Sequence, residues 1–283
     1  MEIRRAGIND LDGITALWKS CFGDEGGYLA FYLSRAYRPE WVWLVMDGSL
    51  PVSMMTLMPC VEWVDGRGKQ GTYVYAVATL PDYRHRGLMT LLHDRAEQVC
   101  RRNGSSFMTL VPADPSLFAM YRKLGYETCA WLYYGKIEKK GSRETPTQFA
   151  PAARPEFTRL RETFLQQFPV SAALSVNDFC YTFEELSVAG YETAMAVNDL
   201  GAGYLVYRLE ESQTLLIRES NLPRLALETA ALSLAGKTHA ESIVIKTAEP
   251  WFRPAEKRPF AMMKRLDTEH ADKPYYMNLM LDD

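Results

Sequence analysis

The residues best suited to chemistry gather in one stretch, Tyr75–Thr90 (YAVATLPDYRHRGLMT). Its pattern predicts a strand that ends near Thr79, a basic turn, and a helix that begins directly after Gly87. The first turn of a helix leaves backbone N–H groups without partners, and the helix dipole places partial positive charge there. Arg84 and Arg86 add permanent positive charge, and Gly87 allows close approach because it has no side chain. We therefore expect this turn to bind a diphosphate group.

A second pattern, Asp114–Tyr126 (DPSLFAMYRKLGY), predicts a short helix downstream of this turn. Asp114 is the candidate N-cap, Pro115 occupies the first helical position, and Gly125 follows the last turn.

The elements around these two patterns form a regular series. Alternating or continuous apolar residues and Gly-containing turns predict strands and an antiparallel meander, and apolar residues at helical spacing predict the helices. The expected strands of the first half are 1–5, 41–46, 52–64, 70–80, 106–111 and 126–137, with helical segments after the first strand and a helix over 88–99.

A charged, then Pro- and Ala-rich segment, Lys139–Pro155, is the expected domain boundary. The element order partly repeats beyond it, which indicates an internal duplication. The expected helices are 156–168 and 222–235, and the expected strands are 192–197, 203–210, 214–218, 242–247, 259–266 and 275–281. The expected fold class is α/β, with a central, mostly antiparallel mixed sheet flanked by helices.

The two chemical patterns resemble motifs of the GNAT superfamily of N-acetyltransferases. The phosphate loop of that family, [QR]-x-x-G-x-[GA], matches Arg84–Leu88, although Met89 replaces the final small residue. Val77, Ala78, Thr79 and Pro81 look like the end of its fourth strand, whose backbone pairs with the pantetheine arm. Similar basic loops with a bulky last position occur in the enhanced-intracellular-survival subgroup of these enzymes. That subgroup also has a second GNAT-like domain.

The resemblance implies tandem GNAT-like domains, a catalytic domain over residues 1–140 and a degenerate one over 155–283. It also implies transfer of an acetyl group from acetyl-CoA to a primary amine of a small molecule or peptide. A backbone N–H near Val77–Thr79, where the strand separates from its neighbour, would stabilise the oxyanion. The implied cofactor-binding residues are Val77, Ala78, Thr79, Arg84, His85, Arg86, Gly87, Leu88, Met89, Thr90 and Asp114.

Tyr121 matches the tyrosine that often protonates the departing thiolate in these enzymes. The alternative is that Tyr121 belongs to an apolar stripe with Leu117 and Leu124. The general base is less apparent, because Gln70–Leu80 contains no acidic residue. In the resembled subgroup the C-terminal carboxylate of the chain reaches the site, which makes Asp283, the last residue here, a candidate base; the alternative is an exposed acidic tail. The other candidates are Glu25 and Glu62, with Tyr73 and Tyr75 as residues that orient water.

The second half lacks the phosphate-binding pattern at the corresponding junction. Glu219–Pro223 (ESNLP) has neither arginine nor glycine before its helix, and Pro250–Pro254 (PWFRP) cannot form a regular helix. We expect this half to bind no CoA and either to wall the acceptor pocket or to form a homodimer contact.

The composition excludes several other classes. The net charge of −3 argues against a nucleic-acid partner, and no apolar run is long enough to span a membrane. The N-terminal residues are charged where a signal peptide would be apolar, so we expect a cytoplasmic protein. The five cysteines form no C-x-x-C pair, so neither a disulfide framework nor a metal site is expected.

Two further functions fit parts of the pattern. A non-catalytic acyl-CoA sensor would use the same loop without turnover. A transferase like the Fem ligases pairs two GNAT-like domains but takes aminoacyl-tRNA, which the acidic balance disfavours.

Overall fold

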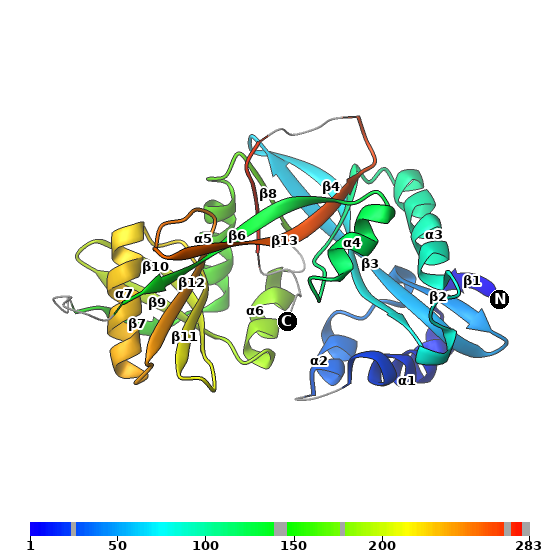
Figure 1. Cartoon of the computed structure of the whole chain (residues 1–283), viewed down its shortest axis with the longest axis horizontal. Coiled ribbons are helices and arrows are strands. Elements are labelled where there is room, and N and C mark those ends of the chain that lie inside the picture. The colour runs from blue at the N-terminus through cyan, green and yellow to red at the C-terminus, as the bar shows by residue number, and fades with distance from the viewer. Residues whose placement is uncertain (24–26, 139–145, 176–178, 269–272, 279–283) are drawn as a thin grey trace.

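Long strands and short connections make up the N-terminal half of the chain (Figure 1). The computed structural model describes residues 1–23, 27–138, 146–175, 179–268 and 273–278. The strands of this half are β1 (Glu2–Arg5), β2 (Val42–Asp47), β3 (Leu50–Val64), β4 (Arg67–Thr79), β5 (Phe107–Leu110) and β6 (Glu127–Ile137). Its α-helices are α1 (Leu11–Phe22), α2 (Tyr28–Arg35), α3 (Leu88–Arg102) and α4 (Leu117–Lys123).

The C-terminal half partly repeats this order, with additional elements and with no helix in the described segment between β12 and β13. Its α-helices are α5 (Arg154–Leu165), α6 (Phe179–Val188) and α7 (Arg224–Lys237). Its strands are β7 (Gln148–Pro151), β8 (Val170–Leu174), β9 (Glu192–Asn198), β10 (Gly201–Leu209), β11 (Thr214–Ser220), β12 (Ser242–Thr247), β13 (Ala255–Arg265) and β14 (Tyr275–Met277).

The two halves share one sheet and exchange a strand. The order is β1-β2-β3-β4-β5-β13-β6-β12-β11-β10-β9-β7, so β13 follows β5 in the first half and β6 follows β12 in the second. Among the described strands, only β4–β5, β11–β12 and β8–β14 pair in parallel, and the other pairs are antiparallel. Figure 1 shows β6 and β13 crossing the middle of the molecule between the halves. The expected mixed, mostly antiparallel sheet is confirmed, and the proposed division between residues 140 and 155 stays a prediction.

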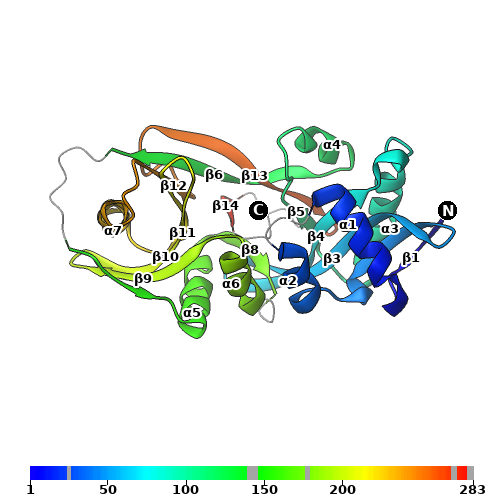
Figure 2. The same ribbon diagram turned by 90° about the horizontal axis from the view of Figure 1, so that it is seen from below.

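Helices cover both faces of the sheet. In the first half, α1 and α2 pack on one face, and α3 and α4 pack on the other. In the second half, α7 packs on one face of β9–β12, and Figure 2 shows α5 on the opposite side. The central strand β3 is buried over most of its length because both of its faces are covered, which explains its nearly continuous apolar sequence.

Strand β8 forms a second connection between the two halves of the chain. It pairs antiparallel with the end of β3, from Cys60↔Leu174 to Val64↔Val170. Helix α6 follows β8 in the chain and packs against α2 of the first half.

Four segments depart from the sequence-based expectations. No strand was expected over β7 or β8 and no helix over α6, because these short segments lack a clear periodicity. Helix α4 begins at Leu117 with Ser116 as N-cap, so the expected N-cap Asp114 is wrong. The Asp114 carboxylate instead accepts the Ser116 N–H (2.8 Å) and closes the turn before the helix.

Candidate active site

Strand β4 separates from β5 after a short parallel contact. The two strands pair at Thr72↔Met108 and Tyr73↔Thr109, whereas β4 continues to Thr79. The register against β3 shifts between Met54 and Thr56, and Ala76, opposite this shift, has a φ of 47°. A β-bulge of this kind turns backbone groups out of the ladder. The expected separation of the strands is confirmed, and it leaves the 74–79 edge of β4 without a β5 partner.

The end of β4 is fixed by side chains on its neighbours. Ser53 Oγ donates to Ala78 O (2.8 Å) and lies 2.8 Å from Thr79 Oγ1. Ala78 packs in the core under α1 and α2, and Val77 faces the core under α3 and α4. Only the backbone of this segment can therefore serve a ligand that lies between β4 and β5.

The basic turn follows β4 directly and ends at the start of α3. His85 and Gly87 have φ values of 61° and 76°, and no atom lies within 4 Å of a Cβ added at Gly87. The first helical hydrogen bond runs from Leu91 N–H to Gly87 O (3.0 Å), so the N–H groups of Leu88, Met89 and Thr90 precede the ladder. Open space before these donors forms the cradle that a diphosphate requires.

The two arginines of the turn are held by backbone carbonyls. Arg84 Nε donates to Thr79 O (3.1 Å), and Arg86 Nη2 donates to Asp82 O (2.8 Å). The Arg86 guanidinium also lies over the Tyr83 ring, 4.9 Å from its centroid. Each guanidinium carries five N–H donors, so these contacts orient the charge and leave further donors for an anion.

Tyr121 belongs to α4, and its side chain lies in the core cluster that α3 and α4 cover. Its ring packs edge-on against His93 (5.8 Å between centroids) and Tyr126 (5.7 Å). Val77 and Leu80 pack against the same core cluster, which places Tyr121 on the α3 side of the open edge of β4. Burial raises the pKa of Tyr121 to about 12, so the phenol keeps its proton at neutral pH.

His93 completes this aromatic group. It is buried, and its Nδ1 lies 3.5 Å from Tyr126 Oη. Burial, assisted by the positive charge of Lys264, lowers the pKa of His93 to about 4. The ring is therefore neutral at neutral pH.

Of the three candidate carboxylates, only Glu62 lies within the described residues. Glu62 is fully buried in a two-pronged ion pair with Arg265, with both O···N distances at 2.6 Å. The interpretation of Glu62 as a substrate-facing group is therefore wrong. Glu25 and Asp283 lie outside the described residues.

The corresponding junction of the second half is built differently. Glu219 is buried and pairs with Arg161 (2.9 Å), while Tyr204 Oη and Tyr276 Oη donate to it at 2.9 Å each. Helix α7 begins after Pro223, which has no N–H. The segment between β12 and β13 contains no helix, as expected from its two prolines. The junction thus lacks the basic turn and the glycine of the first half, and a buried carboxylate lies before its helix.

A cluster that the sequence analysis missed lies on the α1–α2 side of β4. Tyr28 of α2, Tyr75 of β4, and Tyr181 and Glu185 of α6 bring their polar atoms together. Tyr181 and Glu185 are four residues apart, a spacing that would have placed both on one helical face had α6 been recognised.

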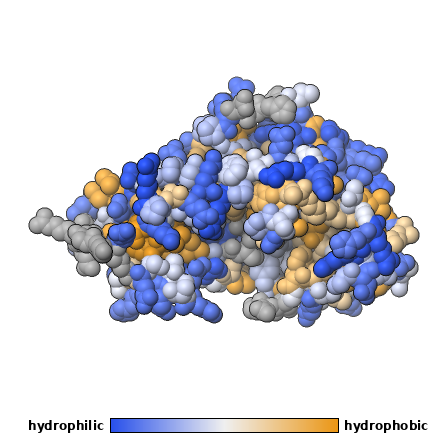
Figure 3. Space-filling view, viewed as in Figure 1, coloured by the Kyte–Doolittle hydropathy of each residue, from blue (hydrophilic) through white to orange (hydrophobic). Residues whose placement is uncertain are grey.

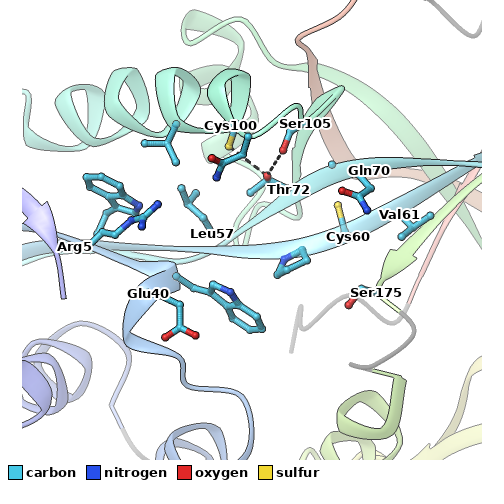
Figure 4. Close-up of a pocket in the computed structure, with 16 residues that line it drawn as sticks. Arg5, Glu40, Leu57, Cys60, Val61, Gln70, Thr72, Cys100, Ser105 and Ser175 are labelled. Carbon is cyan, nitrogen blue, oxygen red and sulfur yellow. Dashed lines mark hydrogen bonds between the residues drawn. The ribbon is translucent and has the colours of Figure 1, made fainter. Parts of the chain in front are cut away.

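Two features of the surface are visible in Figures 3 and 4. Hydrophobic side chains gather on the face in Figure 3 where α4 and the adjoining strands lie, within a mostly hydrophilic surface. The cavity in Figure 4, about 340 Å³, is lined by residues such as Cys60, Thr72, Cys100 and Ser105, and lies near the C-terminal end of α3. It contains none of the residues implied by the resemblance.

Within the described ranges, no helix has both the length and the apolar character needed to cross a membrane. The same residues include no group of three or more His, Cys, Asp or Glu side chains arranged to hold a metal ion.

Comparisons with known proteins agree with this geometry. The sequence profile of the family described as acetyltransferase (GNAT) domain matches residues 2–129. The comparison with curated proteins finds no match. Similar solved structures include a GCN5-related N-acetyltransferase from Kribbella flavida (19% identity, TM-score 0.71, covering 94% of this chain and 72% of that one).

Two further solved structures have the same fold. One is a GCN5-related N-acetyltransferase from Anabaena variabilis (15% identity, TM-score 0.75, covering 94% of this chain and 73% of that one). The other is Eis1 from Mycobacterium abscessus (13% identity, TM-score 0.68, covering 95% and 75%). The profile match spans the open edge of β4, the basic turn and Tyr121, so this chain carries an acetyltransferase domain of the GNAT type over residues 2–129.

Proposed function

We propose that this chain transfers an acetyl group from acetyl-CoA to a primary amine of a small molecule or peptide. The observation that carries the proposal is the separation of β4 from β5 beyond Tyr73, which leads directly into the donors at the start of α3. An extended pantetheine arm would pair with this free edge, and the diphosphate would bind at Arg84–Thr90. Bound acetyl-CoA supplies an activated acyl group as a thioester.

The residues of the chain then have separate tasks. The backbone near the bulge at Ala76 donates to the carbonyl oxygen, where negative charge develops during attack. Tyr121 gives its proton to the departing sulfur, because its raised pKa keeps the phenol protonated until that moment. The same proposal includes a cytoplasmic location and a homodimer contact through the second half. It includes no nucleic-acid partner and no membrane surface.

Tyr121→Phe tests the catalytic assignment, and Tyr126→Phe is the matched control. The control removes a hydroxyl from the same aromatic group, one that lies 3.5 Å from His93 Nδ1. We expect Tyr121→Phe to lower kcat by about 100-fold with CoA affinity unchanged, as for loss of a general acid. Tyr126→Phe should keep kcat within about threefold of the parent, because its hydroxyl has no part in the proton transfer.

The assay reads release of free thiol across a library of amines, with CoA affinity from calorimetry. Equal turnover in the parent and Tyr121→Phe would remove the catalytic assignment. CoA binding without turnover of any amine would favour the sensor, and tRNA binding without CoA binding would favour the Fem-like transferase.

A further inference from the structure

A strand of the second half lies among the strands that carry the transfer site. Residues 262–265 of β13 pair with β5, and Met262 and Met263 also pair with β6. Met262 is fully buried in the core cluster that α3 and α4 cover. Side chains alternate along a strand, so Lys264, two residues later, extends on this same side. The second half therefore places a cation beside the helix that follows the diphosphate turn and the helix that carries Tyr121.

The ammonium group of Lys264 joins these two helices. Its Nζ donates to the carbonyl oxygen of Leu124, the residue directly after α4 (2.9 Å). It also forms an ion pair with Glu97 Oε2 of α3 (2.5 Å). The side chains of Lys264 and Glu97 are 26% and 24% exposed, so water and salt screen this pair less than a fully exposed one.

Glu97 is itself held in place on α3. Its Oε1 accepts hydrogen bonds from Arg101 Nε (3.0 Å) and Nη2 (2.8 Å), one turn later on the same helix. Arg101 Nη1 donates in turn to the carbonyl oxygen of Leu266, which directly follows β13 (2.7 Å). Leu266 thus fixes α3 to the end of β13 through Arg101, and Lys264 extends this connection to α4.

Helix α4 is short and ends in a tight cap. It has seven residues, too few for a helix to be stable by itself in water, so its position depends on tertiary contacts. Tyr121 O accepts the N–H groups of Leu124 (3.0 Å) and Tyr126 (3.1 Å), and Gly125 between them has a φ of 86°. A Cβ added at Gly125 would lie 3.2 Å from Lys264 Cε, so the lysine crosses this cap closely. Lys264 therefore meets α4 at the turn that the carbonyl of Tyr121 closes.

We propose that Lys264 is a positioning residue for the acetyl transfer, which holds α4 against α3 so that the Tyr121 hydroxyl stays directed at the departing sulfur. This inference rests on the proposed acetyl transfer and on the role of Tyr121 in it. Lys264 acts through α4 and takes no part in the proton transfer itself. A misplacement of about 1 Å can lower a rate by about 100-fold, so this contact can control turnover without changing CoA affinity. In this way the second half serves the reaction in the first, although it lacks a basic turn of its own.

Lys264→Met tests this role, because it keeps the length of the side chain and removes its charge and its donor. We expect CoA affinity within about twofold of the parent and kcat, measured as release of free thiol, lower by about 10-fold. Lys264→Arg keeps both the charge and a donor for the helix end, and should restore kcat to within about threefold of the parent. Lys257→Met is the matched control. Lys257 lies on the same strand over the ring of Trp131 (4.8 Å), and its loss should leave kcat and CoA affinity unchanged.

A double-mutant cycle with Tyr121→Phe separates this role from a general loss of structure. If Lys264 acts through the Tyr121 hydroxyl, Lys264→Met should lower kcat by less than about twofold once that hydroxyl is removed. An equal loss in both backgrounds would overturn the proposal, and so would a parental kcat in Lys264→Met when Tyr121→Phe is impaired.

Glu97→Gln provides a second variant, which decides the matter if Lys264→Met fails to fold. It weakens the contact that holds Lys264 Nζ to α3, so kcat should fall by about threefold, and this loss should also disappear in the Tyr121→Phe background. A parental kcat in Tyr121→Phe itself would instead remove the catalytic assignment of Tyr121, and failure of the parent to bind CoA would overturn the proposed acetyl transfer.

Discussion

The glycine at the start of α3 offers a quantitative test of the diphosphate site. Gly87 has a φ of 76°, and an added Cβ would meet no atom within 4 Å. Gly87→Ala therefore introduces no clash, and its effect is the backbone strain of a left-handed L-residue, about 1–2 kcal/mol. If the turn relaxes in the free protein, CoA binding must restore its shape, and the affinity falls by about 5- to 30-fold.

Gly87→Asp adds a negative charge to the same strain. A carboxylate about 5 Å from a phosphate raises the energy by about 1 kcal/mol in water and about 3 kcal/mol at an effective dielectric constant of 20. Together with the strain, the loss is about 2–5 kcal/mol, or about 30- to 5,000-fold in Kd for CoA. Salt screens the repulsion between the carboxylate and the phosphate. The difference in Kd for CoA between Gly87→Asp and Gly87→Ala should therefore be smaller in about 0.5 M NaCl.

Gly104 supplies the control, because it follows the other end of α3. It has a φ of 75°, and an added Cβ again meets no atom within 4 Å. Gly104→Ala and Gly104→Asp should lower stability by the strain without changing the CoA affinity measured by calorimetry. A Kd for Gly87→Asp within twofold of that for Gly104→Asp would show that the diphosphate does not bind at this turn.

Three further predictions concern stability, measured as the free energy of unfolding in urea. Arg161→Met leaves the buried carboxylate of Glu219 without its cation (side chains 1% and 0% exposed), and should lower stability by about 3–5 kcal/mol. His93 has a folded pKa of about 4, below its unfolded value of 6.5, so its neutral ring stabilises the fold above pH 6.5 and this contribution is lost as the pH falls toward 4. Between pH 7 and pH 5 the parent should lose about 2 kcal/mol more than His93→Gln. Gly71→Ala places a Cβ against the ring of Phe107 and should lower stability by about 1–3 kcal/mol.

Each of these changes has a control elsewhere in the chain. Arg154→Met breaks a partly exposed pair with Glu184 and should lower stability by less than about 1 kcal/mol. His85→Gln, in the exposed turn, should leave the parental loss between pH 7 and pH 5 unchanged. Gly68→Ala brings a Cβ to 3.3 Å from Val61 Cγ1 and should be milder than Gly71→Ala. A variant that matches its control would contradict the corresponding reasoning.

Local sequence was sufficient for most elements and for the diphosphate turn. The run from Thr79 through Gly87 to α3 was predictable, because an apolar strand, a basic turn with glycine and a helical period are all encoded within sixteen residues. The absence of a basic, glycine-containing turn at Glu219–Pro223 could be predicted for the same reason. Local sequence was not sufficient at Asp114, because aspartate is equally suited to the N-cap of a helix and to a turn that precedes one.

Tertiary structure alone decided which segments meet. An apolar strand has the same pattern whichever neighbour it pairs with, so no local signal distinguishes β13 beside β5 from β6 in that place. The same holds for Glu62 and Glu219, whose partners Arg265 and Arg161 are distant in sequence. Glu185 reaches Tyr28 only because β8 pairs with β3 and brings α6 against α2. The sequence by itself determined where a diphosphate can bind, whereas the carboxylate beside the open strand arises from pairing between residues more than a hundred positions apart, which no short pattern encodes.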